Sequence, residues 1–164
     1  MFYIGGDFAN SNVELHDVRF AVGSDYGACL EDLRRQWWGD PKTLHIDAYA
    51  EISHADGFDV TLVKAPAEQN EKLFFLNMGG YDPAEFGELH RNVLLVGSSL
   101  HDVQRRALTD ARRAWKSPHK DSAFEVEKAI CLNDMVRGSG LHIQLTPAAL
   151  HRPLDFTCRY QKIA

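Results

Sequence analysis

Glu14-Leu15-His16 recurs 74 residues later as Glu88-Leu89-His90, and this repeat decides the fold that we expect. At the same spacing, Gly5-Gly6 returns as Gly79-Gly80. Repeated motifs at a fixed spacing indicate copies of one supersecondary unit, each of which buries its apolar face against the rest of the chain. The sequence therefore predicts an internal duplication.

The repeat extends to a set of polar residues that later become candidates for a site. Between the shared motifs, Trp38 finds its counterpart Trp115 at a spacing of 77, so the second copy carries three extra residues before its tryptophan. The motif His-x-Asp-x-x-x-Glu occurs in both copies, as His45, Asp47 and Glu51 and as His119, Asp121 and Glu125.

Hydrophobic periodicity predicts two strands, a helix and two more strands in each copy. A strand from about residue 16 to 22 places His16 on the same face as Val18 and Phe20, which predicts a histidine at the rim of the core. Helical stripes follow, with spacings of three and four residues. They comprise Tyr26, Leu30, Leu33 and Trp37 in the first copy and Leu100, Val103, Ala107, Ala111 and Ala114 in the second.

The expected class is α+β, a duplicated ββαββ unit with mainly antiparallel sheet and one main helix per repeat. The boundaries that we expect are 1–63 for the first repeat, 64–72 for a linker, 73–146 for the second repeat and 147–164 for a C-terminal strand extension. The whole should form one compact pseudo-symmetric unit, with the last strand in a place equivalent to residues 73–78. Residues 133–140 are expected to be a long connection.

Two turns are predicted from glycine. Gly5-Gly6 should end the first strand in a tight turn, although close approach of a ligand is the alternative. For the hairpin at Asp56-Gly57 we favour a three-residue loop that pairs Val60 with Ile52. A two-residue loop would pair Val60 with Ser53 and put its apolar set on the polar face of the preceding strand.

Composition limits the classes of function. A formal net charge of −5 argues against binding to nucleic acid or to anionic membranes, since both need a basic face. The cysteines Cys29, Cys131 and Cys158 share no close spacing, so buried free thiols in a reducing cytoplasm are expected rather than disulfides or a zinc motif. The first residues do not resemble a signal peptide, and no apolar run reaches the ~20 residues of a membrane span.

Residues 44–52 alternate between polar and apolar, with His45, Asp47, Tyr49 and Glu51 on one face. Side chains two residues apart on a strand lie about 7 Å apart, near enough to share a metal ion or a water. Imidazole and carboxylate are ligands for zinc, manganese or iron and also serve as general acids and bases. The same pattern suits a solvated sheet face or a carboxylate that pins a histidine, so structural and functional interpretations both stay open.

Several separated motifs resemble one bacterial family. They are ELHDVRF at 14–20, QWWGDPKTLHID at 36–47, GGYDPAEFGELH at 79–90, SPHKD at 117–121, EVEKA at 125–129 and FTCRY at 156–160. Together they are similar to domain of unknown function (DUF) family 1543, whose domain occurs in one or two copies per protein. The resemblance implies a small soluble bacterial protein and a two-copy member, and it supplies no activity and no assigned residue. The second copy lacks the Trp-Trp-Gly sequence of the first.

The function that we expect is a non-enzymatic module that binds a ligand or another protein, with self-association as an option. The alternative is a small metal-dependent hydrolase. No cofactor is identified by any motif, and no metal is assigned. The candidate ligand-binding residues are His45, Asp47, Glu51, His119, Asp121, Glu125, Glu14 and Glu88.

Overall fold

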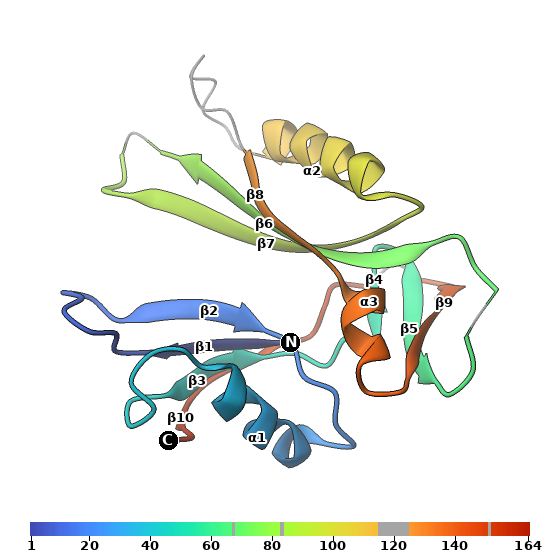
Figure 1. Ribbon diagram of the computed structural model, residues 1–164. Coiled ribbons are helices and arrows are strands. Elements are labelled where there is room, and N and C mark those ends of the chain that lie inside the picture. The colour runs from blue at the N-terminus through green and yellow to red at the C-terminus, as the bar shows by residue number, and fades with distance from the viewer. Residues whose placement is uncertain (67, 83, 115–124, 151) are drawn as a thin grey trace. The chain divides into compact units, whose positions relative to one another are not determined.

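The computed structural model describes residues 1–164 apart from 67, 83, 115–124 and 151, and the chain divides into two compact units. Unit 1 comprises Met1–Ile52 and Pro153–Ala164, and unit 2 comprises Ser53–Arg152. Within the described residues the fold is mixed α+β, with three helices and antiparallel strand pairs (Figure 1). The predicted α+β class with mainly antiparallel sheets is confirmed, whereas the internal duplication stays a prediction. The expected repeat boundaries stay a prediction.

Unit 1 is a four-stranded sheet with one helix against it (Figure 1). The strand order is β10-β3-β1-β2. The elements are β1 (Phe2–Gly6), β2 (Leu15–Arg19), α1 (Tyr26–Gln36), β3 (His45–Tyr49) and β10 (Thr157–Lys162). The core on the helix side contains Phe2, Ile4, Leu33 and Ile46, with Tyr26 and Leu30 packed against it. The apolar stripe predicted for this helix is confirmed.

Unit 2 contains two three-stranded sheets, ordered β7-β6-β8 and β4-β5-β9. The elements are β4 (His54–Ala55), β5 (Phe58–Val63), β6 (Lys72–Tyr81), β7 (Glu88–Gly97), α2 (Leu100–Ala114), β8 (Glu125–Cys131), α3 (Leu132–Arg137) and β9 (His142–Pro147). The small residues Val103, Ala107 and Ala111 of α2 pack against Phe74 and Leu76 of β6. Leu100 in the first turn of α2 is 42% exposed, although the pattern predicted it buried.

The strands of the two units share one pairing register. Gly5 pairs with His16, and Gly79 pairs with His90. On the other side of the central strand, the pairing of β1 with β3 shifts between Tyr3 and Ile4, and that of β6 with β8 shifts between Asn77 and Met78. Such a shift is a β-bulge, in which one strand carries an extra residue. The extra residue is Asp47 in β3 and Glu127 in β8.

The bulge in β3 overturns the predicted alternation of its side chains. Residues that pair across an antiparallel sheet share a face. Ile46 pairs with Ile4, but Tyr49 pairs with Phe2, so Tyr49 packs against the α1 core instead of lying on the polar face. The extra residue, Asp47, exchanges the sheet faces of the two residues that follow it in β3, Ala48 and Tyr49.

The preferred hairpin register is also wrong. Asp56 and Gly57 form a two-residue loop with φ values of 49° and 82°, and Val60 N donates to Ser53 O at 2.8 Å. Positive φ at both central residues defines the hairpin turn that Asp-Gly favours. The register argument failed because β5 pairs with β4 and β9, and its apolar residues need no partner on β3.

Three further expectations need correction. Gly5 and Gly6 lie inside β1 rather than in a turn, and neither has a positive φ. The predicted connection at 133–140 contains most of α3. The last strand, β10, begins at Thr157 and is an edge strand beside β3, whereas β6 is the central strand of its sheet.

Candidate functional site

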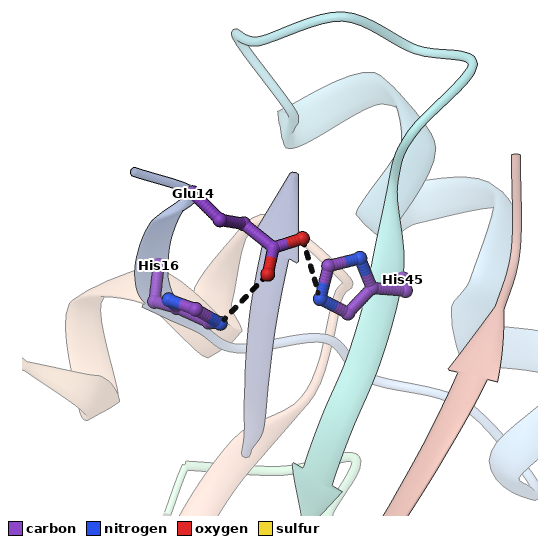
Figure 2. A group of neighbouring side chains, drawn as sticks. All are labelled: Glu14, His16 and His45. Atoms are coloured by element: carbon purple, nitrogen blue, oxygen red, sulfur yellow. Dashed lines mark ion pairs between the residues drawn. The ribbon is translucent and has the colours of Figure 1, made fainter. Parts of the chain in front are cut away.

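Two histidines and two carboxylates of unit 1 converge over the backbone of Gly5. Glu14 immediately precedes β2, His16 lies in β2, and His45 and Asp47 lie in β3. Because Gly5 pairs with His16 on one side and with His45 on the other, the two imidazoles flank the glycine. Figure 2 shows the carboxylate of Glu14 between the two rings.

The distances within this cluster are short. His16 Nε2 lies 3.0 Å from Asp47 Oδ2 and 3.9 Å from Glu14 Oε2. His45 Nε2 lies 3.2 Å from Glu14 Oε1 and 3.3 Å from Asp47 Oδ2 (Figure 2 draws the pairs made by Glu14). In the described part of the chain, neither carboxylate forms an ion pair with a lysine or an arginine. The negative charge is therefore balanced only by groups inside the cluster.

Gly5 is necessary for this convergence. A Cβ at this position would lie 2.7 Å from His16 Nε2 and 2.8 Å from His45 Nε2. Both distances are far below van der Waals contact, so any side chain would push the rings apart. The ring nitrogens thus occupy the space that a side chain on β1 would fill.

His45 is held in one orientation. Its side chain is 2% exposed, and its Nδ1 lies 2.9 Å from the carbonyl oxygen of Thr43. Because a carbonyl oxygen only accepts, we assign the proton to Nδ1, which leaves a lone pair on Nε2 in the neutral ring. That lone pair faces Glu14 and Asp47, and the buried Oδ2 of Asp47 makes no hydrogen bond. Two carboxylates facing a lone pair need a proton or a metal ion between them.

The loop between α1 and β3 fixes Thr43. Thr43 Oγ1 donates to Asp40 O at 3.1 Å and accepts from Asp7 N at 2.8 Å. Asp40 N donates to Asp7 O at 2.8 Å, and the buried Trp37 donates from Nε1 to Asp40 O at 3.1 Å. This network gives the Trp-Trp-Gly-Asp sequence a function in the site, because it positions the carbonyl that orients His45.

Two tyrosines flank the imidazoles. The ring of Tyr3 stacks on His16 with centroids 5.1 Å apart, and the ring of Tyr160 in β10 lies 4.8 Å from that of His45. Burial raises the pKa of Tyr3, and the charges of Asp47 and Asp17 raise it further. Tyr3 therefore keeps its phenolic proton at neutral pH.

The cluster differs in membership from the predicted site. His45, Asp47 and Glu14 are brought together, but the exposed Glu51 follows the end of β3 and is not in the group. His16 was expected at the rim of the core, yet it joins the cluster on the sheet face opposite α1. A solvated sheet face was one interpretation of the polar pattern, but His45 is buried. The bulge at Asp47 changes which residues are its neighbours, and the sequence pattern did not indicate it.

In unit 2, Glu88 and His90 meet Glu127, a residue that the sequence analysis missed. His119 and Asp121 lie outside the described residues, and Glu125 is described only as a backbone partner of Gly79. The 74-residue spacing of the repeat predicted His119, Asp121 and Glu125 as the counterparts of His45, Asp47 and Glu51. The strand pairing instead makes Glu127 the counterpart of Asp47, at a spacing of 80. Glu127 was missed because no sequence pattern indicated where the bulge in β8 lies.

Comparisons with known proteins give a family and a fold. The model of the family described as Domain of Unknown Function (DUF1543) matches residues 11–62. The crystal structure of a protein Il1583 from Idiomarina loihiensis superposes with a TM-score of 0.69 at 23% sequence identity, over 99% of this chain and 95% of that one. This likeness concerns the fold alone.

Two other searches returned no positive finding. No curated protein matches the chain. Within the described residues, no helix is long and apolar enough to cross a membrane. The matched stretch of residues contains Glu14, His16, His45 and Asp47. The resemblance noted in the sequence is confirmed over residues 11–62, and the second copy stays a prediction.

Proposed function

We propose that unit 1 is a non-enzymatic ion-binding module that holds a divalent transition metal, with zinc as the first expectation. The ligands are Glu14, His16, His45 and Asp47. The observation that carries the proposal is His45, whose buried Nε2 points at two carboxylates while its Nδ1 is engaged by the Thr43 carbonyl. Histidines that bind metals usually donate their other ring N–H in this way.

The donor set fits zinc in type and in spacing. Imidazole nitrogens and carboxylate oxygens bind zinc at about 2.0–2.2 Å, which places the ligand atoms of a tetrahedral site about 3.3–3.6 Å apart. Three of the four distances in the cluster, 3.0, 3.2 and 3.3 Å, lie close to the lower end of this range. The unpaired Oδ2 of Asp47 and the space above Gly5 are further support. Manganese and ferrous iron accept the same ligand types.

A metal-dependent hydrolase is the second candidate. The observation that favours it is exposure, because the side chains of Glu14 and His16 are 44% and 30% exposed, while His45 is buried. With only three of the four side chains as ligands, a metal ion would keep a fourth position open to water, and zinc lowers the pKa of a bound water to about 7. Hydrolysis of activated esters by the zinc-loaded protein, lost in Asp47→Asn, would distinguish this role from ion binding alone.

We also propose that the two copies arose by internal duplication, with the repeat boundaries given above. Support comes from the register, since Gly5–His16 and Gly79–His90 are paired alike, and the bulges fall between equivalent residues of β1 and β6. Two strand pairs of unrelated origin would not be expected to carry their β-bulges opposite equivalent residues.

The test is a calorimetric zinc titration of protein that has been treated with chelator and carries no affinity tag. We expect one tight zinc per unit 1, weakened at least about tenfold in Glu14→Gln and in Asp47→Asn. The matched control is Glu51→Gln, which changes a carboxylate outside the cluster and should keep the wild-type affinity. Equal zinc affinity in all four proteins would refute the proposal.

A further inference from the structure

We infer that unit 2 carries a second cation site, formed by Glu88, His90 and Glu127, which takes a hard divalent ion such as Mn²⁺. Glu88 and His90 lie in β7, and Glu127 is the bulged residue of β8. The inference concerns residues outside the unit 1 cluster and does not depend on zinc binding there.

The three side chains offer ligand atoms that lie within 4.8 Å of one another. His90 Nε2 lies 3.1 Å from Glu127 Oε2 and 3.9 Å from Glu88 Oε2. The corresponding distances in unit 1, from His16 to Asp47 and to Glu14, are 3.0 and 3.9 Å. The arrangement of one imidazole and two carboxylates thus occurs in both units.

The backbone below the three side chains is again a glycine. A Cβ on Gly79 would overlap Glu127 Oε1 and would lie 2.5 Å from Glu88 Oε1. Both carboxylates therefore bring an oxygen to the same small space above β6. Carboxylate oxygens of Glu88 and Glu127 lie within 4.8 Å of each other, and two anionic oxygens at this distance repel unless a positive charge lies close by.

No lysine or arginine in the described part of the chain supplies that charge. Within the described residues, the only ion-pair partner of Glu88 and Glu127 is His90, and neither meets a lysine or an arginine. Even a protonated His90 would leave a net charge of −1 on the three side chains. A divalent cation bound with a neutral His90 would bring the net charge to zero, which a single monovalent cation would not.

The composition of the ligand set indicates which ions bind. Unit 1 offers two imidazoles, but in unit 2 the residue of β8 that pairs with the glycine is Glu125 rather than a histidine. A set with one imidazole, a majority of carboxylates and half-exposed side chains suits manganese, magnesium or calcium better than zinc. Manganese accepts both ligand types and can be detected directly.

The experiment is a Mn²⁺ titration of the full chain after one equivalent of Zn²⁺ has been added, followed by the electron paramagnetic resonance signal of free Mn²⁺. We expect one bound Mn²⁺ per chain. In Glu88→Gln/Glu127→Gln and in His90→Gln the affinity should fall at least about tenfold, with an unchanged circular dichroism spectrum.

The control is Glu14→Gln/Asp47→Asn titrated without added zinc, which should give the same Mn²⁺ isotherm as the zinc-loaded wild type. Absence of Mn²⁺ binding to the wild type up to millimolar concentration, or a wild-type isotherm in the Glu88→Gln/Glu127→Gln and His90→Gln variants, would overturn the inference. Loss of zinc binding alone would contradict only the proposal for unit 1, since that proposal is tested by different residues.

Discussion

Substitution of Gly5 by alanine tests whether the geometry of the site, as distinct from the stability of the surrounding fold, determines metal binding. The added Cβ would lie 2.6 Å from His16 Cδ2, 2.7 Å from His16 Nε2 and 2.8 Å from His45 Nε2. These distances are about 1 Å shorter than carbon–nitrogen contacts allow. Both rings must move, and His45 can move only by giving up its bond to Thr43 O or by shifting β3.

The magnitude follows from the type of contact. Insertion of one methyl group into a packed site costs about 1–3 kcal/mol, and we expect this loss in the free energy of unfolding of the metal-free protein. Because the clash falls on the two ring nitrogens that would bind the ion, zinc affinity should fall by at least about a hundredfold, or about 2.7 kcal/mol.

Urea denaturation followed by circular dichroism measures the stability, and calorimetry measures the zinc affinity. Gly138→Ala is the control, since its Cβ would meet only Met135 O at 3.6 Å and its φ of −61° suits alanine. It should change neither quantity appreciably. If Gly5→Ala bound zinc as tightly as the wild type, the convergence of the rings over Gly5 would be irrelevant to metal binding.

Four other predictions test the fold. Asp25→Ala removes the side chain that accepts from Ala28 N at 3.0 Å, so unfolding by urea should become easier by about 1 kcal/mol; an unchanged midpoint would show that this N-cap of α1 contributes nothing. Gly57→Val forces a β-branched residue to a φ of 82° and should cost about 1–3 kcal/mol in the same assay; an unchanged midpoint would contradict this positive φ. Burial raises the pKa of Cys29, so its thiol should react with iodoacetamide at pH 8 far more slowly than the exposed Cys158, and labelling of Cys29 first would contradict its position in the core. The same shift means that the unfolded chain releases this proton first, so stability should decline as pH rises above about 8.5, and less so in Cys29→Ala.

Much of the fold was predictable because local periodicity reflects burial directly. The stripe from Tyr26 to Trp37 identified α1 and its buried face. The element order was also recovered, except for the two-residue strand β4 and for α3, whose six residues lie in a stretch that contains turn-forming residues. Cys158 was expected to be buried but lies exposed on the edge strand β10.

The site was harder to predict because it depends on pairing between distant strands. His16 and His45 meet only because both pair with Gly5, and the sequence shows neither pairing. Asp47 and Glu127 are brought to equivalent places by bulges that leave no pattern in the sequence. A repeat with constant spacing therefore matched Asp47 with Asp121, whereas the strand registers match it with Glu127.

The central claim is that His16 and His45 bind one metal ion together with Glu14 and Asp47. X-ray absorption at the zinc edge of the protein loaded with one equivalent of zinc tests this most directly, because imidazole rings give a recognisable outer-shell scattering pattern. We predict a nearest shell of nitrogen and oxygen at about 2.0–2.1 Å with scattering from two imidazoles, reduced to one in His16→Gln. A spectrum without imidazole scattering, or one that His16→Gln leaves unchanged, would contradict the account.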